Sequence, residues 1–326
     1  MKPRLLVVEL WGLGDLAIAT PFLQAASHAF QVTLLAKPFA QELHAHFWPQ
    51  VRVLPCVAPW TSFHGKYRLP TWPWRELWRL WRALRQEQFD LGLSGRWDPR
   101  DHVVLKLSGA KRRLGFARTG SQVLLTQPLA RPDAEAHRYE NWRVAAAALD
   151  LALPALSQLA WPRPKSQIIV VHSGAAQPVR VWPLERLHEI VRRLRALGHS
   201  VQVLCDPGQL PWWQAHGEPR AVAPASVSEL LALLLRAGLF IGNDSGPGHL
   251  AALCGLPTFT LFGPQLPEWF RPLHPDGAWI AGGPCPYKPC FDNCRFASPH
   301  CLLAVEVEAA WSKISDFLRC QLSAEV

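Results

Sequence analysis

The sequence predicts an α/β fold with two doubly wound, Rossmann-like domains. Short apolar runs typical of buried strands alternate with amphipathic stretches typical of helices along the 326 residues. This pattern restarts after a stretch punctuated by Pro154, Pro162 and Pro164, which is typical of a linker. Two successive arrays, each long enough for its own core, predict two parallel sheets covered by helices.

Each element follows from this alternation. In the first half we expect strands at residues 5–10, 32–36, 51–54 and 89–93 and helices at residues 16–29, 74–86 and 141–149. In the second half we expect strands at residues 168–172, 201–204, 239–241 and 258–262, and helices at residues 184–197, 227–236 and directly after Asp244. Gly198 suits the end of one helix. The domains are then residues 1–160 and 166–304, followed by a helical segment, 305–326, for which packing back on the first domain is left open.

The charge is concentrated in the first half. Residues 1–165 hold 22 Lys and Arg against 12 Asp and Glu, a net +10, whereas residues 166–326 hold 12 against 13, a net −1. Such asymmetry favours an anionic partner for the first half, with charge kept for solubility as the alternative. Because the basic residues mark no known nucleic-acid-binding module, phospholipid or phosphorylated glycan is favoured over nucleic acid.

The location of the protein is expected from its apolar segments. The opening residues, MKPRLLVVEL, run directly into a predicted strand, and no apolar stretch is long enough to span a bilayer. We therefore expect a soluble, cytoplasmic protein whose eight cysteines are reduced.

One predicted helix suits a membrane surface. One face of it carries apolar residues and the neighbouring stripe carries arginines: Trp74, Leu77, Trp78, Trp81 and Leu84, with Arg75, Arg79 and Arg82. This pattern favours a core face with a solvated basic edge, and it also suits peripheral contact with an anionic membrane surface.

The most informative motif is the strand-to-helix turn at residues 243–250, NDSGPGHL. Asp244 or Ser245 is placed to cap the helix, and Gly246 lets the backbone approach a ligand closely. His249 adds a third polar side chain. Helix starts of this kind, above the carboxyl end of a strand, bind phosphates in open α/β sheets. The motif therefore predicts a phosphate-binding turn rather than a plain capped one.

A second turn follows the first predicted strand. Gly12, Gly14 and Ala17 satisfy a loose dinucleotide fingerprint, but the second strand ends at Lys37 without the expected acid. Asp15 would also repel a pyrophosphate there. A carboxylate at a helix N-terminus suits a general base, with a simple helix cap as the alternative.

The second half opens with a strand end followed by small residues, His172-Ser173-Gly174, which leave room for a ligand. Pro183 fits the first position of the next helix. Arg180 lies just before it and could reach a diphosphate with a fork of donors, or remain an ordinary surface arginine.

Together these pieces resemble glycosyltransferase family 9, the lipopolysaccharide heptosyltransferases. The matching segments run in the family's order along nearly the whole chain: Gly14-Asp15 with Thr20-Pro21, His172-Ser173-Gly174, Arg180-Val181-Trp182-Pro183, Asp244 to Leu250, and Phe262-Gly263-Pro264. Two positions depart from the family. Arg180 stands where a lysine is usual, and residues 205–209 lack a glutamate that holds the ribose in several members.

The resemblance implies a GT-B fold with the active site in the cleft between its domains. It implies inverting transfer of a heptose from ADP-heptose to a phosphorylated lipopolysaccharide core, with no cofactor and no essential metal. Asp15 would be the base. The donor would lie on Ser173, Gly174, Arg180, Asp244, Ser245, Gly246 and His249. Another sugar-nucleotide enzyme on this fold, such as an epimerase, and a non-catalytic sugar-nucleotide or glycolipid-binding protein are the alternatives.

Two further groups of residues remain to be placed. Gly14 would leave room for the acceptor beside Asp15. Candidates to bind the acceptor's phosphates are the basic residues on predicted loops, Lys66, Arg68, Arg112 and Arg113.

Four cysteines cluster near the C-terminus: Cys285, Cys290, Cys294 and Cys301. They lack the paired C-x2-C spacing of common zinc sites. Free thiols or a single disulfide are therefore favoured over a metal site.

Overall fold

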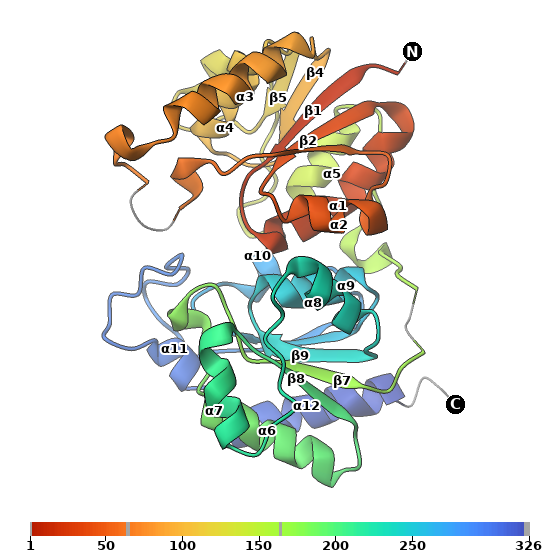
Figure 1. Ribbon diagram of the computed structural model, residues 1–326, viewed down its shortest axis with the longest axis vertical. Helices are drawn as coiled ribbons and strands as arrows, with labels where there is room; N and C mark the ends of the chain where they lie inside the picture. Colours follow the sequence, from red (N-terminus) through yellow and green to blue (C-terminus); the bar gives the residue numbers. More distant parts are fainter. Residues whose placement is uncertain (1, 63–65, 163–164, 323–326) are drawn as a thin grey trace. The chain divides into compact units, whose positions relative to one another are not determined.

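The computed structural model describes residues 2–62, 66–162 and 165–322, so Pro164 of the predicted linker lies outside the described residues. The chain divides into two compact units, Met1–Pro154 and Ala155–Val326 (Figure 1). Each unit is a parallel sheet covered by helices on both faces, as the alternation of apolar runs predicted.

The first unit has a six-stranded sheet in the order β3-β2-β1-β4-β5-β6. Its strands are β1 (Arg4–Glu9), β2 (Gln31–Ala36), β3 (Arg52–Pro55), β4 (Leu91–Ser94), β5 (Arg112–Gly115) and β6 (Gln127–Pro128). All neighbours are parallel; Val8 of β1 lies between Leu35 of β2 and Ser94 of β4. Because β2 and β4 lie on opposite sides of β1, the strand order reverses there, and such switch points open a ligand crevice.

Five helices pack on this sheet. They are α1 (Leu13–Ala29), α2 (Ala40–Phe47), α3 (Trp74–Gln86), α4 (Pro99–Ser108) and α5 (Tyr139–Ala147). Helices α1, α2 and α5 lie together on one face, and α3 and α4 on the other (Figure 1). On the second face, Leu6 and Val8 of β1 are fully buried in one cluster with Leu84 and Leu105. Helix α3 has the predicted bounds, whereas α1 begins at Leu13, so Gly14 and Asp15 belong to its first turn.

The second unit has a five-stranded sheet in the order β11-β10-β9-β7-β8. Its strands are β7 (Ile169–His172), β8 (Val201–Leu204), β9 (Leu239–Asn243), β10 (Thr258–Phe262) and β11 (Ala278–Ala281). Strand β7 lies between β8 and β9, with His172 opposite both Leu204 and Gly242. The strand order therefore reverses at β7, which puts a second switch point at the turn after Asn243.

The helices of the second unit also cover both faces. They are α6 (Leu184–Ala196), α7 (Leu210–Ala215), α8 (Val227–Leu234), α9 (Gly246–Leu253), α10 (Pro267–Phe270), α11 (His300–Leu303) and α12 (Val307–Leu322). Helices α8 and α9 contact one another, and α9 packs on β9 and β10. Gly198 has a φ of 85°, the left-handed conformation expected after the end of α6.

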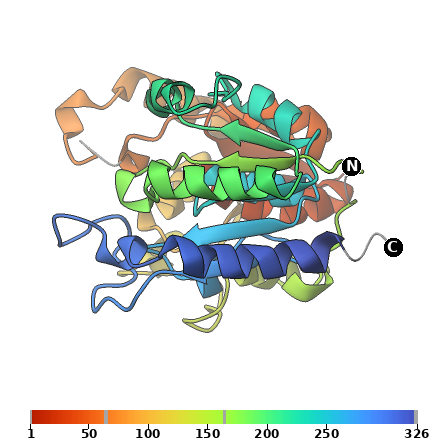
Figure 2. The ribbon, with the colours of Figure 1, turned by 90° about the horizontal axis from the view of Figure 1, so that it is seen from below.

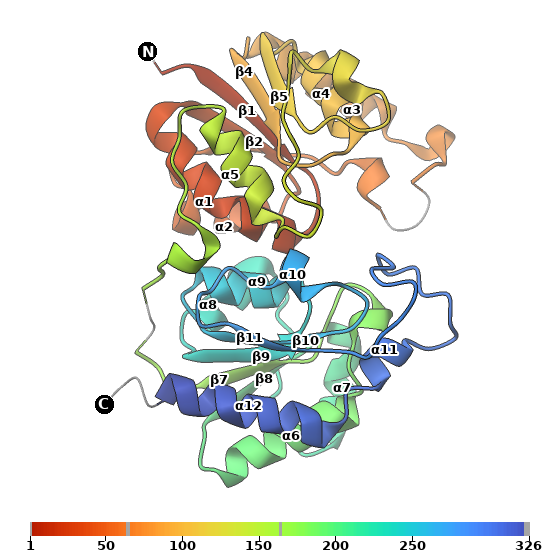
Figure 3. The same cartoon turned by 180° about the vertical axis from the view of Figure 1, so that it is seen from behind.

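Helix α12 packs within the second unit, which answers the question that the sequence left open. It lies along α6 and against β11 (Figures 2 and 3). Ala310, Ile314 and Phe317 bury its apolar face in the cluster that also holds Val191 of α6 and Ile280 of β11. This burial of a continuous apolar stripe fixes the helix on its own unit.

Candidate active site

The turn between β9 and α9 is built as the sequence predicts. Strand β9 ends at Asn243 and α9 begins at Gly246, so Asp244 and Ser245 occupy the turn at the switch point. Both are buried, with 2% and 7% of their surface exposed. His249, one turn into α9, is also buried. Three polar side chains therefore enter a region that water scarcely reaches.

Ser245 occupies the cap position of α9 but makes no capping hydrogen bond. Its Oγ is buried and has no hydrogen-bond partner among the residues that the structure describes. Ser226 gives the contrast, since it caps α8 by accepting the Glu229 N–H at 3.1 Å. A buried hydroxyl without a partner is costly, and here it lies at a helix N-terminus that favours anions. This arrangement is typical of a site that a ligand completes.

Arg180 reaches this turn, as its place in the motif predicted. Its Nη1 donates to Asp244 Oδ2 at 3.2 Å. Its Nε and Nη2 donate to the two carboxylate oxygens of Asp292 at 2.6 and 2.7 Å. Asp292 was not among the predicted site residues, because it lies 112 residues further along the chain.

The strand end at Ser173 supports the turn from inside the unit. Ser173 Oγ donates to Gln209 Oε1 at 2.7 Å and accepts from Trp213 Nε1 at 2.9 Å. The side chain is fully buried and its hydroxyl is engaged within the unit, whereas donor binding at Ser173 stays a prediction. Asn243 Nδ2 donates to the Ser173 carbonyl oxygen at 2.8 Å, which ties the two strand ends together.

Gly174 has a steric reason for lacking a side chain. A Cβ on this residue would lie 2.2 Å from Asp206 Oδ1. Asp206 Oδ2 in turn accepts the N–H of Ala175 at 3.1 Å, and burial raises the pKa of this carboxyl. Asp206 is the acid in the segment 205–209, where the sequence lacks the expected glutamate. Its carboxylate supports this loop instead.

His172 ends strand β7 as a neutral ring. Burial lowers its pKa to about 4, although a hydrogen bond with the backbone of Gly174 opposes the shift. The ring stacks on Phe240 with centroids 6.2 Å apart. This histidine therefore contributes packing rather than charge at neutral pH.

In the first unit, Asp15 has partners for both carboxylate oxygens. Oδ2 accepts the N–H of Gly12 at 3.1 Å, so Asp15 does close the start of α1. Oδ1 accepts a hydrogen bond from Arg96 Nη1. The side chain is still 26% exposed, so an incoming hydroxyl can reach it. The structure thus combines the cap with a solvent-accessible carboxylate.

Two buried carboxyl groups lie behind this pair. Burial raises the pKa of Glu9 to about 8, and the charge of Asp15 adds to the shift. Burial likewise raises the pKa of Asp101 to about 7, and the negative charge of Asp98 is the next largest cause of this rise. Asp101 Oδ2 accepts from Ser94 Oγ at 3.3 Å. The raised pKa favours the protonated form of Glu9 beside the ionised Asp15. In the sequence, this cluster of acids was indicated only by Glu9, which stands at the end of an apolar strand.

Arginines and tryptophans surround the same sheet edge. The guanidinium carbons of Arg96 and Arg100 lie 4.5 and 5.9 Å from the ring centroid of Trp11. Those of Arg131 and Arg138 lie 5.0 and 4.5 Å from the Trp97 ring. Burial lowers the pKa of Arg138 to about 10, with Arg96 as the next cause, and the group remains cationic. We call Arg96, Arg100, Arg131 and Arg138 the arginine group.

Two of the predicted acceptor residues lie elsewhere. Arg112 and Arg113 begin strand β5, opposite Leu91 and Gly92 at the start of β4. In a parallel sheet this is the amino edge, whereas Asp15 follows the carboxyl edge. Arg113 also donates to the Leu124 and Ala110 carbonyl oxygens, both at 2.8 Å. The expectation of a loop was wrong because these residues form part of the sheet.

Lys66 and Arg68 follow β3, at the carboxyl edge. Lys66 Nζ lies 5.3 Å from the centroid of the Tyr67 ring, and Arg68 is exposed. The Tyr67 hydroxyl contributes to the electrostatic environment of Arg100, which links this segment to the arginine group. Both residues therefore keep their place as acceptor candidates.

Helix α3 presents its tryptophans to solvent. Trp74 and Trp78 are 54% and 53% exposed, and Leu84 is the helix's buried residue. Trp81 is anchored to α4 through a hydrogen bond from Nε1 to the Leu107 carbonyl oxygen at 2.9 Å. Within the described ranges, no helix combines the length and apolarity that crossing a bilayer requires.

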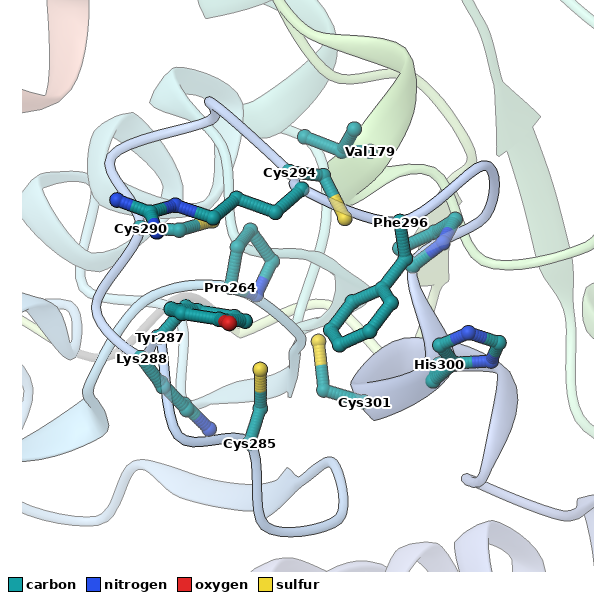
Figure 4. A pocket seen from close by; sticks show the side chains of 12 residues that line it. Val179, Pro264, Cys285, Tyr287, Lys288, Cys290, Cys294, Phe296, His300 and Cys301 are labelled. Carbon is teal, nitrogen blue, oxygen red and sulfur yellow. The ribbon is translucent and has the colours of Figure 1, made fainter.

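The four clustered cysteines line one pocket of the second unit. Cys285, Cys290, Cys294 and Cys301 surround it together with Tyr287, Phe296 and Pro264 (Figure 4). All eight cysteines are free thiols. In the parts of the chain that the structure describes, no group of three or more His, Cys, Asp or Glu is arranged to hold a metal ion.

Comparisons with known proteins agree with this geometry. Residues 77–299 match the profile of glycosyltransferase family 9 (heptosyltransferase). Lipopolysaccharide heptosyltransferase 1 of Pseudomonas aeruginosa is 26% identical over 315 residues, which cover 88% of this chain and 86% of that protein.

Solved structures show the same fold. A family 9 glycosyltransferase from Veillonella parvula has a TM-score of 0.76 at 18% identity and covers 98% of both chains. The E. coli heptosyltransferase WaaC, solved with ADP, has a TM-score of 0.74 at 17% identity over 96% of this chain and 99% of its own. The two Rossmann-like units thus form a GT-B glycosyltransferase. The chain belongs to glycosyltransferase family 9, as the motifs at residues 172–183 and 243–264 indicated.

Proposed function

We propose that this protein transfers a heptose from ADP-heptose to a phosphorylated lipopolysaccharide core, with inversion at the anomeric carbon and without an essential metal. The observation that carries the donor site is the buried, unsatisfied hydroxyl of Ser245 at the start of α9, beside Arg180. A phosphate oxygen would satisfy the hydroxyl and gain the helix N-terminus and the guanidinium.

The donor is proposed to lie along the switch point of the second unit. Gly246 leaves room for the diphosphate to approach the start of α9, while Asp244 and His249 hold the sugar or order the turn. Arg180 stabilises the negative charge that develops on the departing diphosphate. WaaC was solved with ADP and also with a fluorinated ADP-heptose, which supports ADP as the nucleotide.

The chemical step is proposed to use Asp15 as the general base. Its carboxylate takes the proton of the acceptor hydroxyl as that oxygen forms a bond to the anomeric carbon and the bond to the diphosphate breaks. Gly14 leaves space for the acceptor sugar. Arg96 is a positioning residue, since it holds one oxygen of Asp15 and is itself held over Trp11.

The acceptor's phosphates are proposed to bind the arginine group. These four cations lie at the carboxyl edge of the first sheet with Asp15, together with Lys66 and Arg68, and they take the role first expected of Arg112 and Arg113. Because a guanidinium binds phosphate with two parallel hydrogen bonds, a cluster of arginines suits a phosphorylated sugar.

The lipid part of such an acceptor lies in a membrane. We propose that the exposed tryptophans of α3, flanked by Arg75, Arg79 and Arg82, rest on the cytoplasmic face of the inner membrane. Tryptophan and arginine share the polar boundary of a bilayer, and the +10 charge of residues 1–165 attracts anionic lipid.

Titration with ADP, UDP, GDP and dTDP by calorimetry, followed by a transfer assay, tests the proposal. We expect ADP to bind most tightly and ADP-heptose to support transfer that persists in EDTA, with a product whose anomeric configuration is opposite to the donor's. Preference for UDP with epimerised product would identify the alternative sugar-nucleotide enzyme. Tight nucleotide binding without any transfer would identify a binding protein.

A further inference from the structure

The cysteine-rich segment inserts an acidic side chain into the proposed donor site. Asp292 lies between Cys290 and Cys294, and its two oxygens accept from Nε and Nη2 of Arg180 at 2.6 and 2.7 Å. Paired, parallel hydrogen bonds of this kind are the way in which a guanidinium binds a phosphate. Asp292 therefore occupies the side of Arg180 that a diphosphate would use.

The charges at this point oppose an anionic ligand. Arg180 contacts Asp292 and Asp244 at once, so one positive charge faces two carboxylates. A diphosphate entering this arrangement would meet two carboxylates that already bind the same guanidinium. If Asp292 leaves, one of these negative charges and its two hydrogen bonds to Arg180 are removed.

The backbone next to Asp292 is held in an unfavourable conformation at Phe291. Phe291 and Asp292 have φ values of 49° and 69°, in the left-handed region that bulky side chains such as phenylalanine rarely adopt. Such a conformation persists only where neighbouring contacts hold it. Here the contacts include the Arg180 ion pair and the stacking of Phe291 on Trp269, with centroids 6.2 Å apart. Asn293 Nδ2 also donates to the Phe291 carbonyl oxygen at 3.1 Å, and Gln265 Nε2 to Asp292 Oδ1 at 3.5 Å. Loss of the ion pair would allow the segment to relax.

The geometry points to an autoinhibitory contact: Asp292 stands in for the donor's diphosphate on Arg180, and donor binding displaces it together with its segment. This inference rests on the proposed function, because it requires an anionic donor at Arg180. The displacement of Asp292 adds a free-energy cost to donor binding. Only a ligand with a diphosphate offsets this cost, because it binds Arg180 in place of Asp292. A bare sugar, which cannot replace Asp292, would leave the segment closed.

The thiols report this movement. Cys290 and Cys294 lie two residues to either side of Asp292 and face one pocket, which Val179 beside Arg180 also lines (Figure 4). Burial raises the pKa of the Cys290 thiol, and both thiols are half-buried. Displacement of Asp292 would increase the exposure of both thiols to solvent.

Calorimetric titration of ADP into the full-length protein and its variants tests the contact. We expect Asp292→Asn to bind ADP about tenfold more tightly than the wild type, because the amide keeps the shape and loses the charge that competes for Arg180. Asp316→Asn, on the exposed side of α12, makes the same change in net charge and should leave affinity unchanged. In an Arg180→Ala background, Asp292→Asn should give no gain.

The outcomes separate this inference from the proposed function. If Arg180→Ala weakens ADP binding while Asp292→Asn leaves it unchanged or weaker, Asp292 is a positioning partner of Arg180 and the autoinhibitory contact is overturned, but the donor site stands. If neither the wild type nor Asp292→Asn binds ADP, both are overturned. Asp292→Ser provides the same comparison should the asparagine variant fail to fold.

Thiol labelling gives a second readout that does not depend on activity. With saturating ADP, mass spectrometry should show faster alkylation of Cys290 and Cys294 than in the free protein. Cys320, exposed on α12, is the internal control and should react at the same rate in both states. Slower or unchanged labelling of Cys290 and Cys294 would overturn the displacement of the segment.

Discussion

Arg96 binds Asp15 through one guanidinium nitrogen while its central carbon lies 4.5 Å from the ring centroid of Trp11. The N–H of Gly12 holds the other oxygen of Asp15 at 3.1 Å. The carboxylate is therefore oriented by contacts within its own unit before any acceptor binds. Preorganisation of this kind places a base without a loss of entropy at the moment of reaction.

Replacement of Asp15 by Asn should slow sugar transfer by about 10²–10⁴-fold, because the amide keeps the contact with Gly12 but cannot accept the proton. Steady-state kinetics with ADP-heptose and calorimetry with ADP measure the two effects separately. ADP affinity and the melting temperature should stay near the wild-type values. A variant that keeps more than about a tenth of the rate would show that another group is the base.

Arg96→Ala should lower kcat by about tenfold or more, since Asp15 then loses an orienting hydrogen bond. Arg96→Lys should recover part of the rate, because it restores the charge without the stacking on Trp11. KM for the donor should change little in both variants. Arg52→Ala, an exposed arginine paired with Glu87, is the matched control. Equal loss of kcat in that control would assign the effect to overall charge.

Ser245→Ala should weaken ADP binding by about three- to tenfold, because the proposed hydrogen bond between the hydroxyl and a phosphate oxygen is lost. The melting temperature should not fall, because this buried hydroxyl has no partner in the described structure of the free protein. Ser226→Ala should do the opposite: it removes the cap of α8 and costs about 1 kcal/mol of stability, with ADP affinity unchanged. Calorimetry and thermal unfolding of the two variants decide the matter. Loss of stability in Ser245→Ala would make the hydroxyl a structural group.

Stability of the second unit should fall in mild acid because of His172. Its pKa is lowered by burial from 6.5 to about 4. Between these values the unfolded chain binds more protons than the folded one, so the free energy of unfolding decreases as the pH falls from about 6.5 to 4. Urea titrations across this window should give a steeper decline for the wild type than for His172→Asn. Parallel curves would contradict a buried neutral ring.

The pair of substitutions Trp74→Ala and Trp78→Ala should reduce co-sedimentation with vesicles that contain phosphatidylglycerol, because both rings are more than half exposed on α3. Transfer to a soluble, delipidated acceptor should be unaffected. Val123→Ala removes an apolar side chain that is even more exposed, at 75%, elsewhere in the unit and serves as the control. Unchanged sedimentation would assign α3 an ordinary surface role.

Local sequence patterns were sufficient to place the polar turn between β9 and α9. Asp244, Ser245 and His249 lie within six consecutive residues, and a strand followed by a polar helix start has one topological place in a parallel sheet. The same reasoning placed Arg180 near them. It could not show that the Ser173 hydroxyl is consumed by Gln209 and Trp213, since both partners follow the next strand.

Long-range contacts were beyond the same patterns. Arg96 is 81 residues from Asp15, and Asp292 is 112 residues from Arg180. Neither stands in a motif, so only the sheet order brings them to their partners. Arg112 and Arg113 were expected in a loop, because short runs of basic residues are typical of loops. Their backbone instead pairs with β4 at the amino edge of the sheet.

Gly174 and Asp206 follow the ends of two adjacent parallel strands. The Asp206 carboxylate fills the space that a side chain at position 174 would need. A methyl group at 174 would lie 2.2 Å from the Asp206 carboxylate, so alanine there requires a smaller residue at 206. The N–H of Ala175 would then lose its acceptor and need another. We therefore expect substitutions at these two positions to be coupled: among relatives, a side chain at the first should accompany the loss of the acid at the second.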